Sequence, residues 1–175
     1  MSESCNIYFM HGNRDFLVGE AFARKAGLSL LAEPTIIQLN GSSTLLLHGD
    51  SLCKEDSEYV KFRSMVRSAT WQDAFLSKPL DERTQIAREL REKSKAETSN
   101  KAEYITDVTQ SEVEKTLLDN QCALLIHGHT HRPAQHTFKV GGAEFKRMVL
   151  GDWDENGWFI ESSRSGMELK RFITT

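Results

Sequence analysis

Short apolar runs that end in clusters of polar residues are the main pattern along this chain. Asn6–Met10 leads into His11-Gly12-Asn13-Arg14-Asp15, Thr44–Leu47 into His48-Gly49-Asp50, and Cys122–Ile126 into His127-Gly128-His129-Thr130-His131. Runs of this length are typical of buried strands, and polar residues just after such strands are typical of the active-site loops of α/β proteins. The pattern therefore predicts an α/β fold in which three polar loops converge.

Apolar spacing predicts further elements around these three strands. Strands are expected at Leu28–Leu31, Thr35–Leu39, Gln135–Val140, Glu144–Leu150, Gly157–Ser162 and Met167–Ile173, the last four in a C-terminal antiparallel sheet. Helices are expected from Leu17 to Ala26 with Gly27 as C-cap, from Glu55 to Ser68, in a shorter piece around Trp71–Leu80, from a start at Pro79-Leu80-Asp81-Glu82 through Thr84–Lys95, and over Ser111–Asp119. The last helix should start with a capping box of Ser111 and Glu114 and turn Val113, Leu117 and Leu118 inward.

Residues 54–104 have no strand pattern and are rich in Lys, Arg, Glu and Ser. We interpret them as a helical insertion that is apolar on one side and basic on the other. The insertion is either a lid over a site or an ordinary helical hairpin packed on the sheet. The polar residues at its end are either a solvated tail or contacts to phosphate or sugar; they are Ser94, Lys95, Thr98, Ser99 and Lys101.

Composition narrows the class of protein. A chain of 175 residues suits one domain. A formal net charge of -3 and a pI near 6.1 argue against a general nucleic-acid binder. Three cysteines without a C-x-x-C pair favour free buried thiols in a reducing compartment. The sequence shows no signal peptide and no apolar run that would span a bilayer, so we expect a cytoplasmic protein, with peripheral membrane contact left open.

The polar loops carry candidate metal ligands. Asn13 offers an amide oxygen, and His48, His129 and His131 offer imidazoles, a mixture that suits Mn²⁺ or Fe²⁺ better than a structural zinc site. If the segment after Ile126 is extended, alternate residues point to the same side, and His129 and His131 can direct their imidazoles at the same ion. The alternative for the segment after Ile126 is a histidine-rich surface turn. The alternative for the segment after Met10 is a Gly-Asn turn with a solvated arginine. A two-metal centre also needs carboxylates, yet no Asp-x-His occurs in the chain.

These three motifs resemble the last three metal motifs of the calcineurin-like metallophosphoesterases. The likeness is strongest to a branch of that family with arginine at the position of Arg14, where the wider family has histidine. It implies an α/β/β/α sandwich over residues 1–175, with a helical lid inserted at residues 54–104. Family members begin with strands bearing Asp-x-His and Gly-Asp, so the resemblance also implies a domain that is incomplete at its N-terminus.

The resemblance implies a reaction, cofactor and location. The expected reaction is hydrolysis of the pyrophosphate bond of UDP-2,3-diacylglucosamine to UMP and 2,3-diacylglucosamine 1-phosphate (lipid X) in lipid A biosynthesis. Two Mn²⁺ ions per active site are expected, and the protein is expected to be peripheral on the cytoplasmic face of the bacterial inner membrane.

The resemblance also implies roles for individual residues. His129, Asn13 and Arg14 would be catalytic. The metal ligands would be Asn13, His48 and His129 for one ion and His131 for the other. The substrate contacts would be Asn13, Arg14, Asp56, Tyr59, Ser94, Thr98, Lys101 and His129, although Thr98 departs from the family's asparagine. Trp71 and Phe75 become candidates for holding acyl chains.

Two alternatives to this function stay open at the level of sequence. The chain is either an inactive truncated remnant that binds one metal ion, the lipid or a partner subunit, or a phosphodiesterase or nuclease of the same superfamily with another substrate. The mildly acidic composition weighs against a nuclease. If the N-terminal aspartates are indispensable, the chain alone should hydrolyse the nucleotide lipid poorly or not at all.

Overall fold

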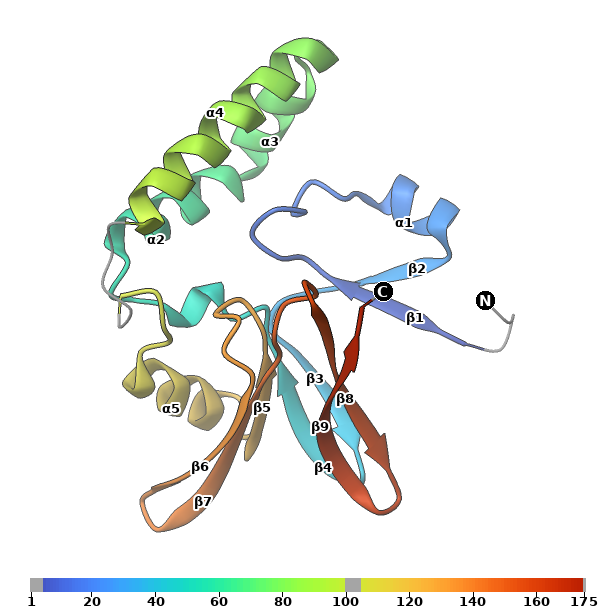
Figure 1. The fold of residues 1–175 in the computed structure, drawn as a ribbon, viewed down its shortest axis with the longest axis vertical. Helices are drawn as coiled ribbons and strands as arrows, with labels where there is room; N and C mark the ends of the chain where they lie inside the picture. Colours follow the sequence, from blue (N-terminus) through green and yellow to red (C-terminus); the bar gives the residue numbers. More distant parts are fainter. Residues whose placement is uncertain (1–4, 100–104, 175) are drawn as a thin grey trace. The chain divides into compact units, whose positions relative to one another are not determined.

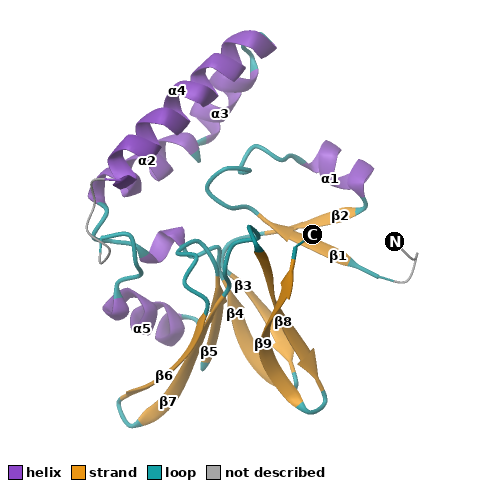
Figure 2. Ribbon diagram, viewed as in Figure 1, coloured by secondary structure: helices purple, strands orange, loops and turns teal. Residues whose placement is uncertain are grey.

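The computed structural model describes residues 5–99 and 105–174, and the side chains of residues 97–99 lie outside this description. The chain forms two compact units, one from the residues up to 52 and from 110 onward, the other from residues 53–109. Figures 1 and 2 show that the strands lie in the first unit, whereas the described part of the second unit is helical. The predicted α/β class is confirmed.

The elements follow the expected order along the chain. The first unit contains β1 (Ile7–Met10), α1 (Glu20–Ala26), β2 (Leu28–Leu31), β3 (Thr35–Leu39), β4 (Ser42–Leu46), a short 3₁₀ turn (Asp50–Leu52), α5 (Gln110–Asp119), β5 (Leu124–His127), β6 (Ala134–Val140), β7 (Ala143–Val149), β8 (Asn156–Ser163) and β9 (Gly166–Ile173). The second unit contains α2 (Ser57–Val66), α3 (Ala69–Leu76) and α4 (Leu80–Ser99).

A five-stranded mixed sheet forms the centre of the first unit, with strand order β3-β4-β5-β7-β6 (Figure 1). Its three middle strands are parallel, and the register places Leu125 of β5 between Leu45 of β4 and Arg147 of β7. The strands β1 and β2 form a separate parallel pair. Parallel middle strands are buried on both faces, which explains why β5 is apolar at three successive positions.

The predicted C-terminal antiparallel sheet is wrong as a single sheet. The hairpins β6–β7 and β8–β9 are antiparallel, but β7 also pairs with β5 and so belongs to the central sheet. The β8–β9 hairpin instead packs Ile160, Met167 and Leu169 against a cluster of Leu124, Ile126 and Met148 on that sheet. Alternation along a strand predicts which side is buried, but it does not identify the neighbouring strand.

Helix α5 presents one narrow apolar stripe. Val113 and Leu117 are fully buried as predicted, whereas Leu118 is 51% exposed, so its predicted inward orientation is wrong. Consecutive helical residues differ by about 100° in direction, and a short helix can direct only one of two adjacent leucines at the core. The predicted capping box also fails, because α5 already begins at Gln110 and places Ser111 inside the helix.

Local turn chemistry follows the sequence closely. Gly27 ends α1 in the left-handed conformation, with φ of 70°. Asn40 and Gly41 both have positive φ, 50° and 76°, which is the turn geometry that suits a two-residue hairpin. Two of the cysteines, Cys53 and Cys122, are buried free thiols as expected, whereas Cys5 is exposed.

The helical unit is held by caps and ring contacts. The carboxylate of Asp56 accepts from the backbone N–H of Tyr59 (3.1 Å), and the hydroxyl of Ser68 accepts from that of Trp71 (3.3 Å), so both side chains cap helix starts. Trp71 also stacks on Phe75 with ring centroids 4.9 Å apart. Among the described helices, none has the length and hydropathy needed to cross a bilayer.

The two neighbouring leucines of α5 provide a test of this fold. We expect Leu117→Ala to lower the free energy of unfolding by about 2–5 kcal/mol, because it opens a cavity at a fully buried position. Leu118→Ala makes the same chemical change on the exposed side of the same helix and should lower it by less than about 1 kcal/mol. Urea unfolding followed by circular dichroism measures both values. Equal losses would contradict the assignment of the buried face.

Candidate functional site

The parallel strands bring the polar loops to one edge of the central sheet. β4, β5 and β7 run in the same direction, so the residues after each strand meet at their carboxyl ends. Backbone hydrogen bonds continue past the strands: Leu47 N–H donates to Ile126 O (3.1 Å), Gly128 N–H to His48 O (2.9 Å) and Leu150 N–H to His127 O (2.8 Å). This edge therefore carries His48, the 127–131 loop and the segment after β7.

The imidazoles of His48 and His129 lie close together at this edge. Their ring centroids are 5.0 Å apart and the ring planes meet at 70°. The backbone N–H of His48 donates to the Glu33 carboxylate (2.8 Å), which fixes the backbone that carries the ring. The sequence predicted both histidines as metal ligands, and the structure brings these two together.

The loop after β1 also reaches His48. A Cβ atom placed on Gly12 would lie 3.0 Å from His48 Cε1, so the absence of a side chain lets the loop pass directly over the ring. Within this loop the Asp15 carboxylate accepts from Gly12 N–H (2.5 Å), and the Asp15 carbonyl accepts from Val18 N–H (2.9 Å). The candidate residues of the loop are thus held by an aspartate; Asn13 is half-buried and Arg14 is exposed.

Gly49 packs against the neighbouring loop and requires glycine for two reasons. Its φ is 116°, a conformation that residues with a side chain rarely adopt. A Cβ atom there would also lie 2.8 Å from His127 Nδ1. His127 itself is only 1% exposed and its Nδ1 lies 2.9 Å from Gly128 O, so this histidine belongs to the packing beneath the site.

The loop that carries His129 and His131 is not extended, so the reason given for their common direction is wrong. His129 has φ of 66° and His131 has φ of 54°. Gly128 O accepts from Thr130 N–H (2.8 Å), and this bond closes a three-residue γ-turn around His129. Positive φ at a non-glycine residue costs about 1–3 kcal/mol and is concentrated at functional sites. Both candidate ligands of this loop are thus among the four described non-glycine residues with positive φ, together with Asn40 and Gln121.

His131 faces a carboxylate that the sequence did not single out. Its Nδ1 atom lies 3.4 Å from Asp152 Oδ2, just beyond the end of β7, and the two side chains are 59% and 51% exposed. Glu33, Asp15 and Asp152 were all missed as site residues. The one available signal for Asp152 was that Gly151-Asp152, like Gly49-Asp50, is a Gly-Asp pair that follows a strand.

The described residues do not form a complete metal shell. Within residues 5–99 and 105–174, no three His, Cys, Asp or Glu side chains are placed so that they could hold a metal ion together. The ligand assignments of Asn13, His48, His129 and His131 therefore stay predictions. The arrangement shown is two adjacent imidazoles, a glycine cradle over one of them and a nearby loop with an amide.

The predicted substrate contacts outside these loops belong to the helical unit. Asp56 caps α2 and Tyr59 is half-buried with its ring centroid 6.5 Å from that of Phe62. Ser94 is exposed on α4. The side chain of Thr98 and the whole of Lys101 lie outside the described residues. These substrate contacts also stay predictions.

Comparison with known proteins finds close relatives of one kind. A UDP-2,3-diacylglucosamine hydrolase of Marinobacter nauticus is 52% identical over 160 residues, which is 91% of this chain and 66% of the relative. The enzyme of the same name from Cellvibrio japonicus is 48% identical over 166 residues, 95% of this chain and 69% of the relative. The enzyme of the same name from Pseudomonas fluorescens is 45% identical over 166 residues, which is 95% of this chain and 67% of the relative.

The chain spans about two thirds of the length of the curated relatives it matches. No family model matches the chain.

The γ-turn at His129 predicts an unusual response to glycine. We expect His129→Gly to leave the free energy of unfolding unchanged or raise it by up to about 1 kcal/mol, because glycine adopts positive φ without steric cost. His136→Gly is the control, since this exposed histidine lies within β6, where glycine should lower the value by about 0.5–1 kcal/mol. Urea unfolding measures both. If His129→Gly lowers the free energy of unfolding more than His136→Gly does, the backbone at His129 is not strained.

Proposed function

The chain belongs to the family of UDP-2,3-diacylglucosamine hydrolases, and on this premise we propose that it hydrolyses the pyrophosphate bond of UDP-2,3-diacylglucosamine. Water adds to one phosphorus atom and the bridging oxygen leaves with the other, which gives UMP and 2,3-diacylglucosamine 1-phosphate. One observation carries the proposal: His48 and His129, 81 positions apart in the sequence, have their ring centroids 5.0 Å apart at the carboxyl edge of the sheet.

We propose that the domain is a metallophosphoesterase-type α/β/β/α sandwich. The central sheet with the β8–β9 hairpin packed on it supports the two inner β layers of that architecture. The buried stripe of α5, with Val113 and Leu117, supports a helical layer outside them.

The donor set fits a divalent cation. Imidazoles and an amide oxygen are suitable ligands for Mn²⁺, and the missing side chain of Gly12 keeps the space beside His48 clear. In this proposal His48 and His129 hold one ion with Asn13, and His131 holds a second. When bound, such ions stabilise the charge on phosphate oxygens and activate water as the nucleophile.

Residues of the chain do the remaining work in this proposal. The planar guanidinium of Arg14 is exposed and suited to bidentate contact with a phosphate of the substrate. His129, held in its γ-turn, orients the diphosphate next to His48. The Glu33 and Asp15 carboxylates fix the two backbones that carry these groups.

We assign the lipid part of the substrate to the helical unit. Asp56, Tyr59, Ser94, Thr98 and Lys101 are the proposed polar contacts. The stacked rings of Trp71 and Phe75 offer apolar surface, and each buried methylene of an acyl chain contributes about 0.8 kcal/mol. Because the proposed substrate is a membrane lipid, we place the protein at the cytoplasmic surface of the bacterial inner membrane.

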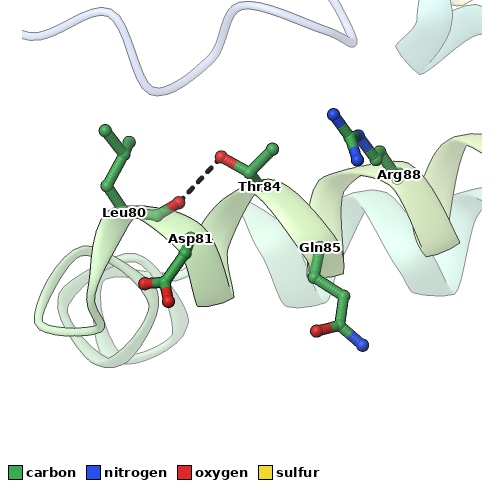
Figure 3. Close-up of a pocket in the computed structure, with 5 residues that line it drawn as sticks. All are labelled: Leu80, Asp81, Thr84, Gln85 and Arg88. Carbon is green, nitrogen blue, oxygen red and sulfur yellow. Dashed lines mark hydrogen bonds between the residues drawn. The ribbon is translucent and has the colours of Figure 1, made fainter.

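The long helix α4 carries a pocket of mixed character. It is lined by Leu80, Asp81, Thr84, Gln85 and Arg88. Figure 3 shows Leu80, Thr84 and Arg88 on one side of the helix and Asp81 and Gln85 on the other. The Thr84 hydroxyl donates to Leu80 O (2.7 Å), so it is used within the helix. An exposed leucine two turns from an arginine suits an amphiphilic ligand better than a fully polar one.

Turnover and metal binding test the proposed reaction. We expect the chain to bind Mn²⁺ in isothermal titration and to release UMP from the nucleotide lipid only slowly, because it lacks the Asp-x-His motif, with release abolished by a chelator. His129→Ala should weaken both by at least about a hundredfold, because it removes a ligand and a substrate contact. His136→Ala, at an exposed position of β6, is the matched control and should change neither. Failure of the chain both to bind Mn²⁺ and to release UMP would refute the proposal.

An acyl-chain series tests the assignment of the lipid. We expect Trp71→Ala to raise KM for long-chain substrate by about tenfold, corresponding to roughly 1.4 kcal/mol of lost contact, while kcat is unchanged. With short acyl chains the same variant should match the parent. An equal effect at every chain length would show that Trp71 only supports the fold of the helical unit.

A further inference from the structure

The pair formed by His131 and Asp152 joins two segments that are distant in sequence. His131 follows β5 and Asp152 follows β7, and the Nδ1–Oδ2 distance is 3.4 Å. The two strands are parallel neighbours, so their ends meet at the same edge of the sheet. The carboxylate thus lies on the Nδ1 side of the imidazole.

The segment that carries Asp152 is fixed on both sides of it. A Cβ atom on Gly151 would collide with the indole of Trp158, so that ring lies directly on the glycine backbone. On the other side, Trp153 Nε1–H donates to Trp158 O (2.9 Å). The preceding Leu150 N–H bonds to His127 O (2.8 Å). Asp152 is therefore held between two residues that are both anchored on β8.

Both side chains of the His131–Asp152 pair are largely exposed, which limits their contribution to stability. With 59% and 51% of the two side chains exposed, an ion pair of this kind contributes between about 0 and 1 kcal/mol to stability. Stability therefore does not account for an anchored carboxylate in this place. The 3.4 Å separation is that of an ion pair, and a carboxylate at this position favours the ring tautomer whose proton lies on the nitrogen beside it.

We propose that Asp152 is a positioning residue for His131: its carboxylate retains the proton on Nδ1 and leaves the Nε2 lone pair directed at a divalent cation. Carboxylate partners of this kind set the tautomer and ring direction of metal-binding histidines. The backbone φ of 54° at His131 constrains the same ring from the other end. The role of the cation rests on the proposed function, whereas the tautomer is a property of the metal-free chain.

Nitrogen-15 NMR of the histidine rings in the metal-free chain tests the proposal. In spectra recorded at about pH 8, Nδ1 should be the protonated nitrogen of the His131 ring. Asp152→Ala should shift it toward the Nε2–H form, and Asp152→Glu should restore the Nδ1–H form. Asp154→Asn removes an exposed carboxylate from the same turn and should leave the tautomer unchanged. The proposal is overturned if Asp152→Ala leaves the tautomer of His131 unchanged.

Metal titration separates this inference from the proposed function. We expect Asp152→Ala to weaken Mn²⁺ binding about 10- to 100-fold and Asp154→Asn to leave it unchanged. A changed tautomer with unchanged Mn²⁺ affinity would support the pair and overturn the assignment of His131 as a ligand. An unchanged thermal unfolding midpoint in Asp152→Ala is also expected, and a lowered midpoint with an unchanged tautomer would make Asp152 a purely structural residue.

Discussion

Parallel pairing of β4, β5 and β7 is the constraint on which the site depends. The register of these strands places the residues after them at one edge, and three backbone hydrogen bonds beyond the strand ends keep the loops together. A slip of one residue would turn every side chain of a strand to the opposite face. The backbone hydrogen bonds beyond the strand ends oppose such a slip, because their donors and acceptors would no longer lie opposite each other. The pairing of the strands thereby sets the separation of the His48 and His129 rings.

Much of the fold could be predicted because local patterns determine elements. Gly27 ends α1 as expected, and Asn40-Gly41, a pair typical of two-residue hairpin turns, forms one between β3 and β4. Partners of strands could not be predicted in the same way. The β6–β7 hairpin joins the central sheet only because β7 pairs with β5, and nothing in the alternation of β7 indicates that neighbour. The exposed side of Leu118 similarly depends on the direction of α5, which a run of two leucines does not define.

The loops of the candidate site could be predicted from their motifs, but the residues that hold these loops could not. Glycines and histidines after buried strands identified the three loops, and the structure brings the rings of His48 and His129 together. The residues that hold these loops were missed because each acts on a partner across space: Glu33 lies 15 residues before His48, and Asp152 lies 21 residues after His131. The positive φ of His129 could not be predicted either, because few histidines adopt it and the tertiary structure decides which ones do.

The contact between Gly151 and Trp158 ties the sheet edge to the β8–β9 hairpin. Any side chain at 151 would displace the indole, and a smaller ring at 158 would leave the glycine backbone uncovered. A larger residue at position 151 therefore requires a smaller one at position 158 if the backbone is to stay in place. The contact between these two residues thereby keeps the β8–β9 hairpin against the edge of the sheet.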